Sequence, residues 1–146
     1  MSNLNQEVLR KVKQWLAHAD EDLCLAQYGL TMSSSCPYRL IAYHAQQCVE
    51  KYLKAYLVHR MEDFPYTHNI SRLLELCDKQ QVNWTETIQD AKGLTSYAIT
   101  TRYPNEDEEV TREEARYAIH LATQVRQTVR ITLIQEGMEL PIEAAI

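Results

Sequence analysis

Four polar residues in one segment, between residues 37 and 59, could bind a phosphate or the polar edge of a base. These residues are His44, Gln47, Lys51 and Lys54. With about 100° of rotation per helical residue, the four fall within one arc of a helix whose opposite face is apolar. An imidazole, an amide and two ammonium groups on one face offer point charges and adaptable hydrogen bonds to a nucleotide. The same pattern is also typical of an ordinary solvated helix face, with Glu50 and Lys54 as an i,i+4 ion pair.

Two further places in the chain are candidates for nucleotide contacts. His68 stands at the expected start of a helix, where free backbone N–H groups and the positive end of the dipole favour an anion. Arg102 and Tyr103 precede Pro104, which biases Tyr103 toward extended geometry and makes a corner that can present both side chains outward. Arg102 could then clamp a phosphate and Tyr103 could stack on a base, although packing against the preceding helix explains the pattern equally well.

The cysteines do not indicate a metal site. The four cysteines are Cys24, Cys36, Cys48 and Cys77. They show neither a Cys-x-x-Cys spacing nor histidines at the intervals that zinc ligands have. We expect free, mostly buried thiols, as is usual in a reducing compartment. The chain also has no Gly-rich loop, so no flavin, nicotinamide or phosphate-loop cofactor is predicted.

Composition limits the classes of partner. The net charge is −5, with 15 basic and 20 acidic side chains, which disfavours coating of nucleic acid but leaves room for a local basic site. No stretch approaches the roughly 20 apolar residues that span a bilayer, and residues 1–7 lack the basic-then-apolar order of a signal peptide. We therefore expect a cytoplasmic protein with no membrane association.

The elements that carry these residues are predicted to be helices. Only 3 glycines and 4 prolines occur in 146 residues, which favours a few long helices over a sheet with frequent turns. Apolar residues at intervals of three and four predict three long helices, near residues 4–33, 37–59 and 111–136, and two shorter ones, near 67–78 and 83–103. Thr111 and Glu114 form a capping-box pattern that opens the last of them.

Five such helices with short connections predict an all-α fold, an antiparallel helical bundle. The bundle is expected to form one domain over residues 1–136. Residues 137–146 show no clear period and are expected to be a C-terminal tail that is loose or bound to a partner.

Four segments follow one another in a recognisable order: Trp15 to Leu23, His44 to Leu57, Thr67 to Ile70 and Thr101 to Pro104. In this order and spacing they resemble the HEPN family, the higher-eukaryote and prokaryote nucleotide-binding proteins. The resemblance implies a bundle of about five helices, often dimeric and often encoded beside a minimal nucleotidyltransferase in a toxin–antitoxin-like system. Some members of the family are ribonuclease toxins and others are binding modules, so the resemblance does not assign an activity.

The resemblance also implies where catalytic residues would lie. Ribonuclease members carry an Arg, four to six residues and then a His, which can act as general base toward a ribose 2′-hydroxyl. Arg39 and His44 match this spacing and are the candidate catalytic residues, but they lie earlier in the chain than the family pattern implies. Counted from Arg102, the matching positions 107–109 hold carboxylates, which repel phosphate.

We therefore expect a nucleotide- or RNA-binding HEPN module that forms a homodimer and acts with a partner nucleotidyltransferase. Its expected binding residues are His44, Gln47, Lys51, Lys54, His68, Arg102 and Tyr103. A metal-independent ribonuclease toxin that uses Arg39 and His44 is the first alternative. A non-catalytic helical-bundle interaction protein is the second.

Overall fold

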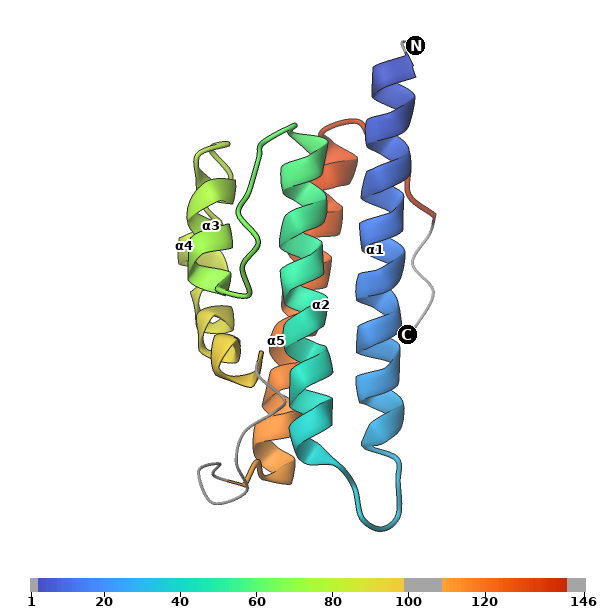
Figure 1. The fold of residues 1–146 in the computed structure, drawn as a ribbon, viewed down its shortest axis with the longest axis vertical. Coiled ribbons are helices and arrows are strands. Elements are labelled where there is room, and N and C mark those ends of the chain that lie inside the picture. The colour runs from blue at the N-terminus through green and yellow to red at the C-terminus, as the bar shows by residue number, and fades with distance from the viewer. Residues whose placement is uncertain (1–2, 99–108, 142–146) are drawn as a thin grey trace.

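The chain folds into three long helices with a group of shorter helices packed along one side (Figure 1). The structure is a computed structural model that describes residues 3–98 and 109–141. In these ranges the elements are α1 (Asn3–Gly29), α2 (Tyr38–His59), α3 (Ile70–Asp78), α4 (Trp84–Thr87), the 3-10 helix η1 (Gln89–Tyr97) and α5 (Arg112–Gln135). No strand occurs in the described ranges, so the predicted all-α bundle is confirmed.

The directions of the three long helices do not alternate as they do in a simple up-and-down bundle. In Figure 1, α1 runs opposite to α2, whereas α2 and α5 run the same way. The first turns of α2 and α5 meet where Ile41 and Ala115 share a small apolar cluster, and their far ends meet where Tyr56 contacts Glu136. The shorter helices between α2 and α5 return the chain to the end at which α2 began.

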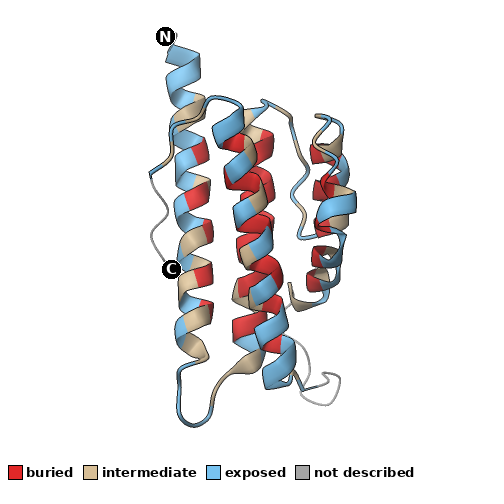
Figure 2. Ribbon diagram, turned by 180° about the vertical axis from the view of Figure 1, so that it is seen from behind, coloured by how far each residue is buried: buried red, intermediate tan, exposed pale blue. Residues whose placement is uncertain are grey.

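Helix α1 packs against the bundle through the stripe of apolar residues from which the helix was predicted. Its buried residues are Val12, Leu16, Ala19, Leu23 and Ala26, and Figure 2 shows them on the side turned toward the other long helices. The helix ends at Gly29, a turn earlier than expected. A Cβ atom at Gly29 would lie 2.8 Å from Cγ1 of Ile41, so the absent side chain lets the start of α2 approach closely.

Helix α2 is the central element of the bundle. It packs against α1, α5, α3 and η1, and its face with Ile41, Ala45 and Tyr52 is fully or almost fully buried. The face opposite to α5 is bordered by α1 on one side and by the 60–69 connection on the other (Figure 1). The candidate polar residues lie on this side of α2, next to α1.

The predicted fourth helix is divided in two. It breaks at Ile88, whose φ of −127° and ψ of 33° leave the helical region, and it continues as η1. Asp78 accepts hydrogen bonds from the backbone N–H groups of Trp84 (2.7 Å) and Thr85 (3.1 Å), so the start of α4 is fixed by the preceding helix and not by Asn83. The apolar spacing predicted which residues are buried here, but not the change in helix type.

The helix starts were predicted with mixed success. The capping box of α5 is confirmed, because Thr111 Oγ1 accepts from the Glu114 N–H and Glu114 Oε1 accepts from the Thr111 N–H, both at 3.0 Å. The helix expected near residues 67–78 begins at Ile70, because its cap is Asn69, which accepts from the Arg72 N–H at 3.1 Å. Thr67 accepts from the Asn69 N–H at 3.0 Å.

The chain beyond α5 begins with a packed segment. Met138 and Leu140 contact the main core, so this part of the predicted tail is not loose. None of the helices in residues 3–98 and 109–141 is long and apolar enough to cross a membrane.

Candidate functional site

One carboxylate of α1 holds two of the predicted residues of α2. Asp22 Oδ1 lies 2.8 Å from His44 Nδ1, and Asp22 Oδ2 lies 2.6 Å from Lys51 Nζ. The side chains of His44 and Lys51 are 26% and 25% exposed. We call these three residues the Asp22 site. Because an ionised carboxylate only accepts hydrogen bonds, Nδ1 of His44 carries the proton and Nε2 is the ring nitrogen left for another partner.

Gln47 lies on α2 one turn from both His44 and Lys51. Its Oε1 atom is buried and has no hydrogen-bond partner within the described part of the chain. A buried acceptor that is left unsatisfied costs roughly 1–3 kcal/mol. A donor group or a water at this position would remove that cost, so Gln47 adds an acceptor next to the two basic groups.

Lys54 has a different environment from the rest of the predicted arc. Its side chain is only 7% exposed, and Nζ lies 2.7 Å from Glu50 Oε1. The same ammonium lies 5.7–5.9 Å from the ring centroids of Trp15, Phe64 and Tyr66, which we call the Lys54 cage. The i,i+4 pair of Glu50 and Lys54 that the alternative interpretation gave is therefore present, but it is buried and not on a solvated helix face. The 60–69 connection folds back over α2 and covers the pair with aromatic rings that attract a cation.

Glu50 is a buried carboxylate with several donors. His68 Nδ1 lies 3.0 Å from each of its oxygens, and Gln46 Nε2 donates to Oε2 at 3.2 Å. Together with Lys54, these groups offset the cost of burying the charge. His68 therefore ties the 60–69 connection to α2, and the start of α3 is capped by the neighbouring Asn69.

The candidate catalytic pair does not converge on one face of α2. Arg39 and His44 are five positions apart in the sequence, which places them about 140° apart around the helix axis. Arg39 is exposed, whereas His44 is turned toward α1 and Asp22. Arg102 and Tyr103 lie outside the described residues.

A second carboxylate of α1 links all three long helices. Asp20 accepts from the hydroxyl of Tyr52 on α2 and, at 2.9 Å, from Nε of Arg126 on α5. Burial raises the pKa of Tyr52, and the hydrogen bond to Asp20 raises it further. The tyrosine stays a neutral donor at ordinary pH, so its hydrogen bond to Asp20 helps to connect the three long helices.

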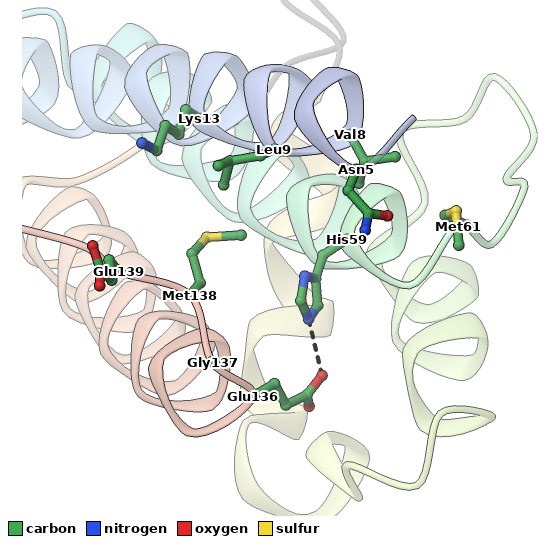
Figure 3. A pocket seen from close by; sticks show the side chains of 10 residues that line it. All are labelled: Asn5, Val8, Leu9, Lys13, His59, Met61, Glu136, Gly137, Met138 and Glu139. Carbon is green, nitrogen blue, oxygen red and sulfur yellow. Dashed lines mark hydrogen bonds and ion pairs between the residues drawn. The ribbon is translucent and has the colours of Figure 1, made fainter. Parts of the chain in front are cut away.

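A cavity of about 600 Å³ lies at the end of the bundle where α2 finishes (Figure 3). It is lined by Asn5, Val8, Leu9, Lys13, His59, Met61, Glu136, Gly137, Met138 and Glu139. Figure 3 shows the contact between His59 and Glu136, in which Nε2 lies 3.0 Å from Oε1. Glu136 also accepts from Tyr56 (2.8 Å) and Arg60 (3.2 Å). None of the predicted site residues is among these lining residues.

Sequence reasoning missed Asp22 and the aromatic residues of the Lys54 cage. Asp22 and Trp15 both lie in the first family-like segment, and their partners His44, Lys51 and Lys54 lie in the second. The pairing of the two segments was a usable signal, because residues of one family pattern on two adjacent helices are candidates for contact. Phe64 and Tyr66 gave no such signal.

No metal centre is formed by the residues that the structure describes. In residues 3–98 and 109–141, no group of three or more histidine, cysteine or acidic side chains could hold a metal ion. The four cysteines are free thiols, with Cys48 and Cys77 buried and Cys24 and Cys36 half-buried.

Comparison with known proteins relates the whole bundle to one family. The sequence model of the HEPN domain matches residues 12–132. The crystal structure of TT1696 from Thermus thermophilus is similar with a TM-score of 0.69 and 30% sequence identity, over 84% of this chain and 98% of that chain. No curated protein matches the sequence. This chain therefore belongs to the HEPN domain family.

Proposed function

We propose that this chain is a nucleotide- or RNA-binding HEPN module and that it binds a phosphate at the Asp22 site. The observation that supports this most directly is the shared carboxylate: Asp22 holds both the imidazole of His44 and the ammonium of Lys51 at the surface. Both groups are partly desolvated and fixed in place, so little conformational entropy is lost when a ligand binds. Gln47 lies beside them, and its buried Oε1 is an acceptor that suits a ligand N–H or hydroxyl group and not a phosphate oxygen.

The charges of the Asp22 site suit a local and not a long-range interaction. Asp22 offsets one positive charge, and the protein as a whole carries −5. The ammonium of Lys51 is the positive group of the site, and the imidazole of His44 lies beside it on the same carboxylate. Binding by this route depends on close contact, as expected for a nucleotide or a short RNA segment and not for nonspecific coating.

The assembly and setting of the module are proposed from the family resemblance. We propose a homodimer that acts with a separate minimal nucleotidyltransferase, as in toxin–antitoxin-like pairs, in the cytoplasm. Arg102 and Tyr103 stay proposed contacts, whereas Lys54 and His68 act in this proposal mainly by shaping the surface beside the Asp22 site.

A metal-independent ribonuclease is the second candidate, because the Asp22–His44 contact is also the arrangement that orients an imidazole as a general base. Arg39 lies on another face of α2 and cannot hold a phosphate beside His44. An arginine for this role would have to come from elsewhere, such as a second copy of the chain. We favour binding without cleavage for this reason.

The test is binding and cleavage of a labelled single-stranded RNA by wild type and three variants, measured by fluorescence anisotropy and gel electrophoresis. Loss of one charge-assisted hydrogen bond costs about 1.5–3 kcal/mol, so we expect Lys51→Ala to weaken binding about 10-fold or more. The matched control is Lys79→Ala, which removes an exposed lysine at the end of α3 and should bind like wild type. Cleavage that disappears in His44→Ala would favour the ribonuclease, and no binding by wild type would favour a pure interaction protein.

A further inference from the structure

The cavity at the end of the bundle is formed by the first part of α1, the end of α2 and the chain just after α5 (Figure 3). Its volume of about 600 Å³ lies within the range of small-molecule sites, which is roughly 300–1,000 Å³. Lys13 and Asn5 both line it and are eight residues apart on α1, a rise of about 12 Å. None of the residues of the Asp22 site lines this cavity, so a ligand here would be separate from one bound there.

The middle of the cavity is apolar. Figure 3 shows Leu9 of α1 and Met138 of the chain after α5 turned toward each other across it. Both residues, and Val8 beside Leu9, are only half-buried. Apolar surface that is still partly exposed stabilises a complex when a ligand covers it, by roughly 25 cal/mol per Å². The middle of the cavity therefore suits an apolar group, and the flexible thioether of Met138 can adapt to its shape.

One end of the cavity carries a charge of each sign. Lys13 of α1 and Glu139 of the chain after α5 lie at this end, on opposite walls (Figure 3). Both residues are exposed, and neither side chain makes an ion pair in the described part of the chain. An ammonium and a carboxylate that are both still available match a ligand whose head group also carries both charges.

The other end of the cavity offers a hydrogen-bond acceptor. Nε2 of His59 carries the proton that faces Glu136, because an ionised carboxylate only accepts hydrogen bonds. Nδ1 is then the ring nitrogen left for a ligand, and in the neutral ring it accepts from an N–H or O–H group. Glu136 already accepts three hydrogen bonds, so it is not left for a cationic ligand.

We infer that the cavity binds a zwitterionic α-amino acid with a large apolar side chain. The carboxylate of this ligand pairs with Lys13, its ammonium pairs with Glu139, and its side chain covers the apolar middle and extends toward His59. A phosphate ligand does not fit, because two carboxylates line the cavity beside a single lysine. A fatty acid would leave Glu139 without a partner, and an alkyl amine would leave Lys13 without one.

The test uses free L-tryptophan, which has both charges and an indole N–H group that can donate to His59. Its matched analogues are tryptamine, which lacks the carboxylate, and indole-3-propionate, which lacks the ammonium. In protein with ¹⁵N-labelled histidine rings, L-tryptophan should shift the signals of His59 and leave those of His44 unchanged. An exposed ion pair contributes up to about 1 kcal/mol, so each analogue should bind about 2- to 5-fold more weakly than L-tryptophan.

Two substitutions assign each charge of the ligand to its partner. Lys13→Ala should weaken binding of L-tryptophan about 2- to 5-fold and leave binding of tryptamine unchanged. Glu139→Ala should weaken binding of L-tryptophan by a similar factor and leave binding of indole-3-propionate unchanged. The matched control is Lys11→Ala, which should bind like wild type, since Lys11 is exposed on α1 and does not line the cavity.

Three results would overturn the inference. The first is that neither L-tryptophan nor the smaller L-leucine shifts the signals of His59. The second is that tryptamine or indole-3-propionate binds as tightly as L-tryptophan, and the third is that Lys13→Ala binds L-tryptophan like wild type. RNA binding at the Asp22 site is measured separately, so the proposed function and this inference can fail independently.

Discussion

Oδ1 of Asp22 and Nδ1 of His44 lie 2.8 Å apart and join the second half of α1 to the first half of α2. The second oxygen of the same carboxylate contacts Lys51 at 2.6 Å, so one acidic residue positions two basic ones. This arrangement accounts for a histidine and a lysine that are neither buried nor free in solvent.

We expect Asp22 and Lys51 to be energetically coupled. The pair is largely shielded from solvent, so a double-mutant cycle with Asp22→Ala and Lys51→Ala should give a coupling of about 1 kcal/mol in urea unfolding. The reference is the cycle of Glu7 and Arg10, an exposed pair within α1. Its coupling should be smaller, and equal couplings would mean that Asp22 holds Lys51 no more firmly than a surface pair does.

We expect Lys54→Met to destabilise the fold strongly, although it keeps the apolar stem of the side chain. Removing one partner of a buried ion pair leaves Glu50 uncompensated and costs about 3 kcal/mol, measured as the free energy of unfolding in urea. The double variant Glu50→Gln/Lys54→Met should recover part of this loss. Lys79→Met is the exposed control and should change stability by less than about 0.5 kcal/mol. A Lys54→Met protein as stable as wild type would contradict the buried pair.

The buried cysteines should be unreactive in the folded protein. Burial raises the pKa of the Cys48 thiol well above its ordinary value, and the nearby charges of Asp20 and Asp22 raise it further. Burial likewise raises the pKa of Cys77. In the double variant Cys24→Ser/Cys36→Ser, a chromogenic disulfide reagent should react with no thiol in buffer and with two thiols in urea. Rapid reaction in buffer is the outcome that this structure does not allow.

The contacts of Glu136 predict a loss of stability in acid. Burial alone would raise its pKa, but the hydrogen bonds from Tyr56, His59 and Arg60 outweigh burial and lower the pKa below the ordinary value. A lowered folded-state pKa gives stability that is present above the unfolded-state pKa and disappears as the pH falls through the folded-state pKa.

Wild type should therefore melt at a higher temperature than Glu136→Gln at pH 7, and the gap should shrink as the pH falls from about 5 to 3, around the ordinary carboxyl pKa. In Tyr56→Phe, which removes one of the three donors, a smaller pH-dependent change is expected. Thermal melts followed by circular dichroism at each pH would measure these differences in melting temperature. A difference between wild type and Glu136→Gln that stays constant with pH would count against these contacts.

The features that were predictable from the sequence depend on residues close together in the chain. Thr111 and Glu114 are three residues apart, so their capping box needs only the local geometry of a helix start. The stripes of α1 and α2 follow in the same way from apolar residues one turn apart, and the bundle then follows from the need to bury them.

The features that were not predictable depend on contacts between distant segments. Lys54 looked solvent-exposed by helix phase alone, because nothing local shows that Phe64 and Tyr66 return over α2. The start of α4 has a similar origin, since Asp78 of the preceding helix accepts the hydrogen bond from the Trp84 N–H. For the Asp22 site the residue types on α2 were predicted, whereas the carboxylate that organises them lies 22 residues earlier than His44.

The most direct test of the Asp22 site is to observe the histidine rings while single-stranded RNA is added. In a ¹⁵N NMR titration of ring-labelled protein, binding at this site should shift the signals of His44 and leave those of His120, on α5, unchanged. His59 serves as a second reference, because it lines the cavity at the end of the bundle. Shifts at His59 or His120 without a shift at His44 would show that RNA binds elsewhere and would contradict the proposed site.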